Sequence, residues 1–330
     1  ENVVSSVVGS GRSTQMHVSV GGQAELLRGL TLMAYQLRDW QRTKYDRHLG
    51  STNLADYISD LPKEAVDQQL FPKDLMFAAT LGSAANIMQN LTKASSAVAL
   101  IGVDGKLQWF SESASQQTAL AVIFDVVDGK RATETKVADV ARFLSSVVEF
   151  LKMSEQALNT RAAILRERDA QGVRPVDQLR EAQGDLKLLV MALANFLSSE
   201  TIGADGLVRP LYSYDAKTET VSGASGVPDI HDQTVVIRAL LDAADTVSAN
   251  IYRTSAIDLF SAMNARFYRP ELGFYTRSED SKELDLAAVS SVLVAGERLA
   301  PYLAKERATE WSAVSKPWLN ALRDAAEKLP

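Results

Sequence analysis

The 330-residue sequence contains no cysteine. This absence excludes disulfide bonds, thiolate metal sites and cysteine nucleophiles together, and it is compatible with any redox compartment. Only three histidines are present, and neither an HExxH motif nor a His-x-His spacing occurs. The sequence therefore predicts no metal site, and no other cofactor motif is evident.

Long apolar runs and blocks of like charge are also missing. No run reaches the length of about 18 apolar residues that a membrane span requires. The net charge of -6 is spread along the chain without a basic stripe, so nucleic-acid binding is not expected. The chain starts with Glu1 rather than Met, which is typical of an exported protein without its signal peptide or of part of a longer chain. We expect a periplasmic or extracellular location.

The residues that are present favour a large helical core, since 46% of them are hydrophobic. Residues 1–20 are rich in Ser, Gly and Val and predict a tail or an edge strand. Residues 21–330 predict a single domain, because the apolar spacing becomes helical at Gly21. Besides that first helix, helical spacing covers residues 54–70, 73–92, 115–128, 134–167, 176–200, 230–248, 252–267, 283–300 and 304–327.

Three short segments interrupt the helices and predict β-hairpins. The first, at 98–110, has an Asp104-Gly105 turn between two apolar runs, which is a strong hairpin signal. The second, at 207–223, alternates polar and apolar residues, and the third, at 266–276, turns through Pro270 and Gly273.

One helix sequence recurs. GGQAELLRGLTLMA at 21–34 aligns with HDQTVVIRALLDAA at 231–244, so that Gln23 matches Gln233 and Arg28 matches Arg238. Recurrence of this kind predicts a ring or array of helical hairpins. Two counts of the inner helices are open. Extending the register of Gln23 and Gln233 to other helices gives six, whereas pairing the predicted helices in order gives five hairpins. The six starts would be Gln23, Asp74, Gln117, Asp185, Gln233 and Asp285.

The stretch from Asp229 to Tyr275 carries a resemblance to a known superfamily. It combines an apolar helix ending Leu-Leu-Asp-Ala, a return helix and the motif Phe-Tyr…Gly-Phe-Tyr. In this it resembles the six-hairpin glycosidase-like, or (α/α)-toroid, superfamily, in particular the C-terminal toroid of thioredoxin-domain proteins. The resemblance implies an all-α toroid or helical-hairpin array of five or six hairpins, with short β-hairpins on one rim. The thioredoxin part is not present, and without cysteine no redox role is carried over.

The superfamily includes glycoside hydrolases, polysaccharide lyases and sugar epimerases, whose sites lie at the funnel mouth formed by one end of the inner helices. That placement implies that Gln23, Gln117 and Gln233 contact a ligand at the mouth. Hydrolysis of a glycosidic bond needs one protonated and one ionised carboxyl group. Asp232 with Glu283 or Asp285 is the predicted pair, although an Asp at a helix start is usually a cap.

Other side chains suit related roles. His231 and His17 could act together as acid and base in an epimerase, or make ordinary loop hydrogen bonds. Aromatic residues gather in the three hairpins, where they could stack on sugar rings, contact a partner protein or pack the hairpins onto helix ends. These aromatics include Trp109, Tyr212, Tyr214 and Tyr275.

The sequence therefore predicts a carbohydrate-binding or carbohydrate-processing domain, hydrolase-like or epimerase-like if it is active. The alternative is a non-catalytic interaction domain of a larger exported assembly. The expected partner is an oligosaccharide in the first case and a protein in the second.

Overall fold

The computed structural model describes residues 6–10, 13–39, 98–101, 104, 106–109, 120–160, 175–278 and 281–326. Within these ranges the chain is mainly helical, and a short 3-10 turn at Ala300–Tyr302 joins the last two helices. The α-helices are α1 (Val20–Asp39), α6 (Val137–Thr160), α8 (Pro175–Ser199), α9 (Ile230–Val247), α10 (Asn250–Phe267), α11 (Leu286–Leu299) and α12 (Lys305–Ala326).

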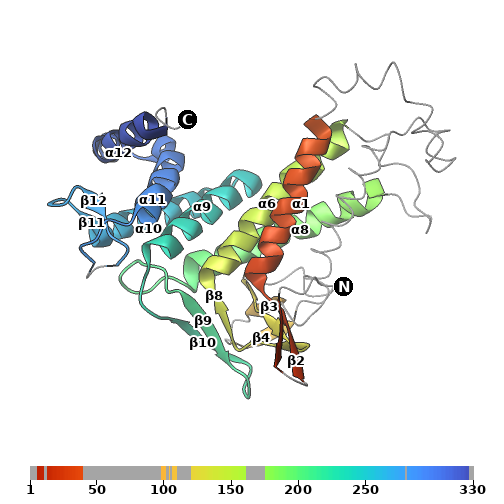
Figure 1. Ribbon diagram of the computed structural model, residues 1–330. Coiled ribbons are helices and arrows are strands. Elements are labelled where there is room, and N and C mark those ends of the chain that lie inside the picture. Colours follow the sequence, from red (N-terminus) through yellow and green to blue (C-terminus); the bar gives the residue numbers. More distant parts are fainter. Residues whose placement is uncertain are drawn as a thin grey trace.

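The helices form consecutive hairpins in two rows. Helices α1, α6, α9 and α11 pack side by side in that order, and we call them the inner row. Helix α8 packs against α6 and α9, α10 packs mainly against α9, and α12 follows α11 (Figure 1). Within the described residues, the predicted fold class of an all-α helical-hairpin array with short strands is confirmed.

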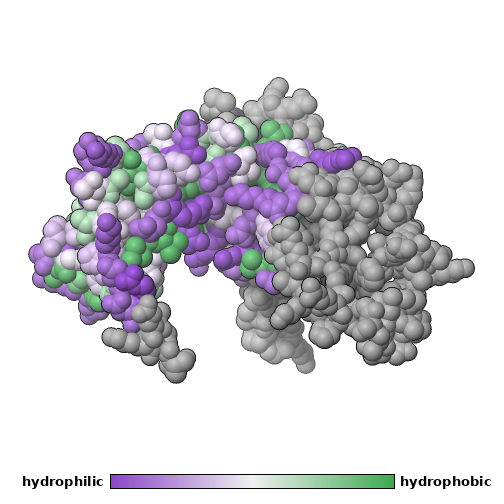
Figure 2. Space-filling view, turned by 90° about the horizontal axis from the view of Figure 1, so that it is seen from above, coloured by the Kyte–Doolittle hydropathy of each residue, from purple (hydrophilic) through white to green (hydrophobic). Residues whose placement is uncertain are grey.

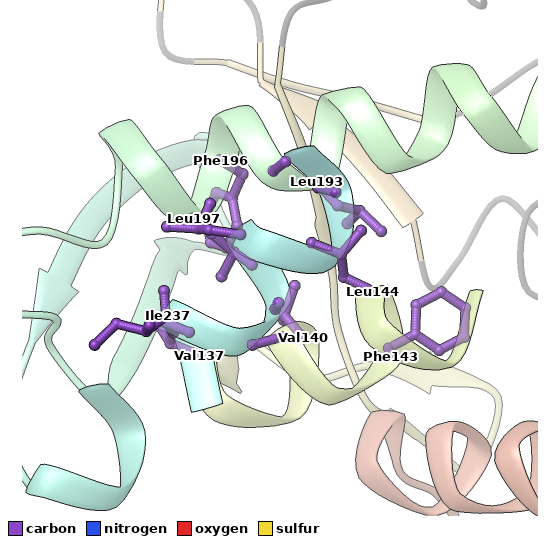
Figure 3. Close-up of a cluster of buried hydrophobic side chains, with 14 of the residues drawn as sticks. Val137, Val140, Phe143, Leu144, Leu193, Phe196, Leu197 and Ile237 are labelled. Carbon is purple, nitrogen blue, oxygen red and sulfur yellow. The ribbon is translucent and has the colours of Figure 1, made fainter. Parts of the chain in front are cut away.

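The core lies between the inner row and α8. Phe143 and Leu144 of α6, Phe196 and Leu197 of α8 and Ile237 of α9 are all fully buried there (Figure 3). With Val140 of α6 and Leu193 of α8, which are also buried there, the spacing becomes three and four residues and places the cluster on one face of each helix. Burying each such side chain contributes about 1.5–3 kcal/mol, so this cluster holds the two rows together.

Short antiparallel strands occupy the end of the molecule where the inner helices begin (Figure 1). Strands β2, β8 and β10 lead almost directly into α1, α6 and α9. The sheets run in the orders β1-β2-β6-β7, β10-β9-β8, β4-β3-β5 and β11-β12. Their strands are β1 (Ser6–Ser10), β2 (Ser13–Val18), β3 (Val98–Ile101), β4 (Leu107–Trp109), β5 (Ala121–Ile123), β6 (Val126–Val127), β7 (Lys130–Arg131), β8 (Glu134–Lys136), β9 (Leu211–Asp215), β10 (Thr220–Ser225), β11 (Tyr268–Arg269) and β12 (Phe274–Tyr275).

All three predicted hairpins are present, as the pairs β3–β4, β9–β10 and β11–β12. The residues before α1 form the paired strands β1 and β2. The helix predicted over 115–128 is wrong where that segment is described, because residues 121–123 and 126–127 are strands. Four of these five residues are Val or Ile, whose branched side chains favour extended backbone.

The sixfold register also needs correction. Asp185 lies in the middle of α8, outside the inner row, and α6 takes its place between α1 and α9. The apolar spacing around Asp185 is that of any buried helix, and it does not identify an inner one. Asp74, Gln117 and the helices predicted over 54–70 and 73–92 lie outside the described residues, so the number of hairpins stays a prediction.

Figure 2 views the molecule from the side away from β9 and β10. The described surface on that side is mainly hydrophilic, with small hydrophobic areas among the hydrophilic ones. None of the described helices combines the length and the apolar character needed to cross a membrane.

Candidate functional site

The beginnings of the four inner helices bring carboxylates to one rim. Asp125 accepts a hydrogen bond from the first N–H of α1, that of Val20, at 2.7 Å. Asp229 caps α9 through the N–H of His231, and Asp285 caps α11 through two backbone N–H groups. These caps satisfy N–H groups that a helix leaves unpaired, and they match the positive end of the helix dipole.

Asp232, in the first turn of α9, differs from these caps. Burial raises the pKa of its carboxyl above the ordinary value, and the nearby Asp229 carboxylate adds to the effect. Asp139 also raises this pKa, whereas Arg142 and His231 oppose the shift. Among the described residues, no hydrogen bond engages the Asp232 side chain. Asp232 is therefore a partly buried carboxyl group that is biased towards its protonated form.

Asp139, in the first turn of α6, is the neighbour that sequence reasoning missed. Arg142 donates a hydrogen bond to its Oδ1 at 2.6 Å. The carboxylate also lies against α1, because a Cβ added at Gly21 would come within 2.9 Å of its Cγ and Oδ1. A local signal existed, namely an acidic residue in a first turn followed by Arg three residues later, but many solvent-exposed helix starts share it.

His231 is in the first turn of α9, and its side chain faces α11. Its Nδ1 is 3.4 Å from the Ser291 hydroxyl, and its Nε2 is 3.9 Å from Oδ2 of Asp285. The backbone N–H of Ala288 is the main cause that lowers the pKa of Asp285, and the N–H of Ala287 adds to it. Asp285 therefore stays ionised near the imidazole.

Arg277 completes this part of the rim. Its Nε donates to Asp229 Oδ2 at 2.8 Å, and its backbone carbonyl accepts a bond from the N–H of Ile230. The hydrogen bond to Asp229 raises the pKa of the Arg277 guanidinium, which therefore stays charged. The start of α9 is thus fixed by a residue that follows the β11–β12 hairpin.

The structure brings together some of the predicted site residues and separates others. Asp232, His231 and Asp285 lie around the starts of α9 and α11. Glu283 is exposed on the segment before α11, where its backbone N–H donates to Ser281 Oγ. His17 pairs with Asp125 at 3.0 Å, beside the start of α1, so the two predicted imidazoles have different partners. Gln117 and the Trp109 side chain lie outside the described residues.

Five further predicted ligand contacts are buried. The Gln233 amide bonds to the N–H and C=O of Val208 and to the C=O of Asp229. The Tyr212 ring packs edge-on against Phe196, and Tyr275 donates to Asn264. These positions favour a role in packing over contact with a ligand; the five residues are Gln23, Gln233, Tyr212, Tyr214 and Tyr275.

The arrangement can donate and accept protons at one place. Asp232 supplies a carboxyl with a raised pKa, Asp139 supplies a carboxyl group held by Arg142, and His231 supplies an imidazole on the same rim. No group of three His, Asp or Glu side chains within the described ranges is arranged to hold a metal ion.

Comparison with known proteins finds structural likeness only. No protein-family model matches the chain, and no curated protein matches its sequence. The unsaturated glucuronyl hydrolase of Bacillus sp. GL1 is similar over 92% of this chain and 73% of its own, with 12% identity and a TM-score of 0.48. A D-mannose isomerase is similar over 86% and 56%, with 10% identity and a TM-score of 0.40. A sugar epimerase from a ruminal bacterium is similar over 92% and 75%, with 9% identity and a TM-score of 0.37. The resemblance to the C-terminal toroid of thioredoxin-domain proteins stays a prediction.

Proposed function

We propose that this chain processes carbohydrate by acid/base chemistry at the rim where the inner helices begin. The observation that carries the proposal is the environment of Asp232. Its carboxyl is partly buried, feels the charges of the Asp229 and Asp139 carboxylates, and has no hydrogen-bond partner among the described residues. Such a group holds a proton at a pH where ordinary carboxyls have lost theirs.

Asp232 would act as the proton donor in cleavage of a glycosidic bond. Its proton passes to the glycosidic oxygen as the bond from that oxygen to the anomeric carbon breaks. Asp139 would accept a proton from the water that attacks the same carbon. Exchange with solvent then restores both groups, so no other reactant is needed.

We assign the proton-accepting role to Asp139 rather than to the two partners predicted from the sequence. Arg142 holds it with a side-chain bond, whereas Asp285 is engaged by the N–H groups of its own helix. Glu283 is exposed and lies outside the helix starts. In an epimerase-like reaction, His231 would take the place of one carboxyl group.

Turnover of a panel of neutral and acidic oligosaccharides, followed by mass spectrometry of the products, tests this proposal. Asp232→Asn and Asp139→Asn should each lower kcat by about 10²–10⁴-fold. Asp258→Asn, a matched change at an exposed position on α10, should leave turnover unchanged. Wild-type turnover should fall as the pH rises through the raised pKa of Asp232. Full activity of Asp232→Asn, or no turnover of any member of the panel, would contradict the proposal.

A second candidate is the non-catalytic interaction domain. The observation in its favour is that aliphatic side chains are exposed just before α9 and at the first residue of α11, whereas Tyr212, Tyr214 and Tyr275 are buried. Val227 is 81% exposed and Leu286 is 62% exposed. Under this alternative the wild type turns over no sugar but binds a defined partner protein. Leu286→Ser should abolish that binding, whereas Leu319→Ser, the same change on α12, should not.

A further inference from the structure

Helix α12 lies beyond α11, at the end of the inner row, and most of its surface is exposed (Figure 1). Among its side chains that the structure describes, only Trp311 and Ser315 are buried. The indole N–H of Trp311 donates to Glu297 of α11 at 2.9 Å, and its ring packs edge-on against Phe260 of α10. These contacts fix the first half of α12 to the helical body.

The second half of α12 has a different anchor. The indole N–H of Trp318 donates to the backbone carbonyl of Gly273 at 3.1 Å, in the turn between β11 and β12. Pro317 directly precedes this tryptophan inside the helix. A proline has no N–H to donate to the carbonyl of Ala313, four residues earlier, so it weakens the helix at this point. The half of α12 that carries Trp318 is therefore joined to the anchored half by a weakened turn.

The turn that Trp318 contacts leads directly to the rim. Strand β12 follows Gly273, and the N–H of Thr276 then donates to the carbonyl of Phe267, the last residue of α10, at 3.0 Å. The next residue, Arg277, donates to the carboxylate that caps α9 at 2.8 Å, and its carbonyl accepts a bond from the first N–H of that helix. Arg277 follows Gly273 by four residues, or about 13 Å of extended chain. One short segment thus connects α12 to the first turn of α9.

We propose that Trp318 is a positioning residue for the rim. Its indole N–H holds the β11–β12 turn, and the turn holds Arg277 against the start of α9, where His231 and Asp232 lie. When the second half of α12 moves away at Pro317, this support is lost and the start of α9 loosens. The effect on turnover rests on the proposed function, whereas the coupling of α12 to α9 can be measured without a substrate.

The contact has the strength of a latch rather than of a fixed support. Trp318 is only partly buried, and the residues on either side of it, Pro317 and Leu319, are exposed. A single hydrogen bond between uncharged groups changes an equilibrium about two- to tenfold. The ring of Trp311, by contrast, is 4% exposed, so the first half of α12 should stay in place while the second half moves. Displacement of the second half would then reach the acid group on α9 without any contact at the rim.

Hydrogen exchange of single amides, followed by NMR without any ligand, tests the coupling. Trp318→Phe keeps an aromatic ring and removes the donor. It should speed exchange of the Ile230 and His231 amides about two- to tenfold, because their hydrogen bonds depend on the junction at the start of α9. The Val20 amide, bonded at the start of α1, should exchange as in the wild type. Lys316→Met, a change at an exposed position on α12, should leave all three amides unchanged.

Two more variants test the route and the hinge. In an Arg277→Met background, Trp318→Phe should cause no further acceleration, because the junction is already lost. A full additional effect there would overturn the route through Arg277. Pro317→Ala restores the missing helix N–H and should slow exchange of the Ile230 amide, whereas faster exchange would overturn the hinge.

The outcomes separate this inference from the proposed function. Unchanged exchange at Ile230 and His231 in Trp318→Phe would overturn the positioning role. Equal acceleration of the Val20 amide would also overturn it, because it would show a general loss of stability. If the wild type turns over a sugar, Trp318→Phe should lower kcat by at most about tenfold. Acceleration confined to Ile230 and His231, without turnover by the wild type, would support the positioning role and refute the proposed reaction.

Discussion

Replacement of Gln233 by Leu should destabilise the protein by about 3 kcal/mol. The Gln233 side chain is fully buried, and its amide pairs with both the N–H and the C=O of Val208, at 2.7 and 3.0 Å. Leu has a similar volume, so the change removes the partners without opening a large cavity. Val208 is itself fully buried, and water cannot replace the lost bonds. Two unsatisfied backbone groups cost about 1–3 kcal/mol each, and the added apolar burial offsets about 1 kcal/mol of that sum.

Urea unfolding of wild type and Gln233→Leu, monitored by tryptophan fluorescence, measures this cost. Glu310→Leu on the exposed surface of α12 is the control, and it should stay within about 0.5 kcal/mol of the wild type. The Val208 amide proton should also exchange faster in the variant. A loss below about 1 kcal/mol with unchanged exchange at Val208 would show that Gln233 does not fix this turn, and its role as a ligand contact would regain support.

Three further changes test the rim and the helix contacts. Because burial raises the folded-state pKa of Asp232, its contribution to stability is present below the unfolded pKa and is lost as the pH rises through the folded value; in urea unfolding, Asp232→Asn should therefore gain stability relative to the wild type as the pH rises from the ordinary pKa of Asp through the raised one. Gly296→Ala should cost about 2 kcal/mol in thermal unfolding, since its Cβ would overlap the buried ring of Trp311, and Trp311→Leu in the same background should recover part of the loss. Asp242→Asn should cost about 1 kcal/mol, because its partner Arg298 is more than one-third exposed, and a double-mutant cycle with Arg298→Met measures the coupling.

The repeated helix could be predicted from the sequence because its polar first turn and its apolar spacing both recur. Gln23 and Gln233 recur with the same apolar spacing, and both fall near the starts of inner helices. Apolar spacing could not separate inner from outer helices, which is why Asp185 was given the wrong place. It also could not exclude strands at 121–127, because a short buried strand and a buried helix have equally apolar sequences.

The site was harder to predict than the fold. Asp232 could be selected as a carboxylate at a helix start, but its raised pKa comes mainly from burial, which depends on how the helices pack, and then from the nearby Asp229 carboxylate. Asp285 could not be distinguished from a cap until its two backbone bonds were visible. The sequence left open whether the hairpin tyrosines contact a ligand or pack the hairpins onto helix ends, and the structure buries Tyr212, Tyr214 and Tyr275.

The contact of Arg277 with the start of α9 has a consequence for the dynamics of the rim. The ion pair to Asp229 and the backbone bond to Ile230 join the two ends of the segment that runs through α9, α10 and the β11–β12 hairpin. A segment closed in this way is expected to open as one cooperative unit, with its amide protons exchanging together. Asp232 lies within that unit and Asp139 lies outside it. The spacing of the two carboxyl groups would then depend on whether this closed segment is intact, and cutting the chain at the β11–β12 turn should disturb the rim without touching either acid.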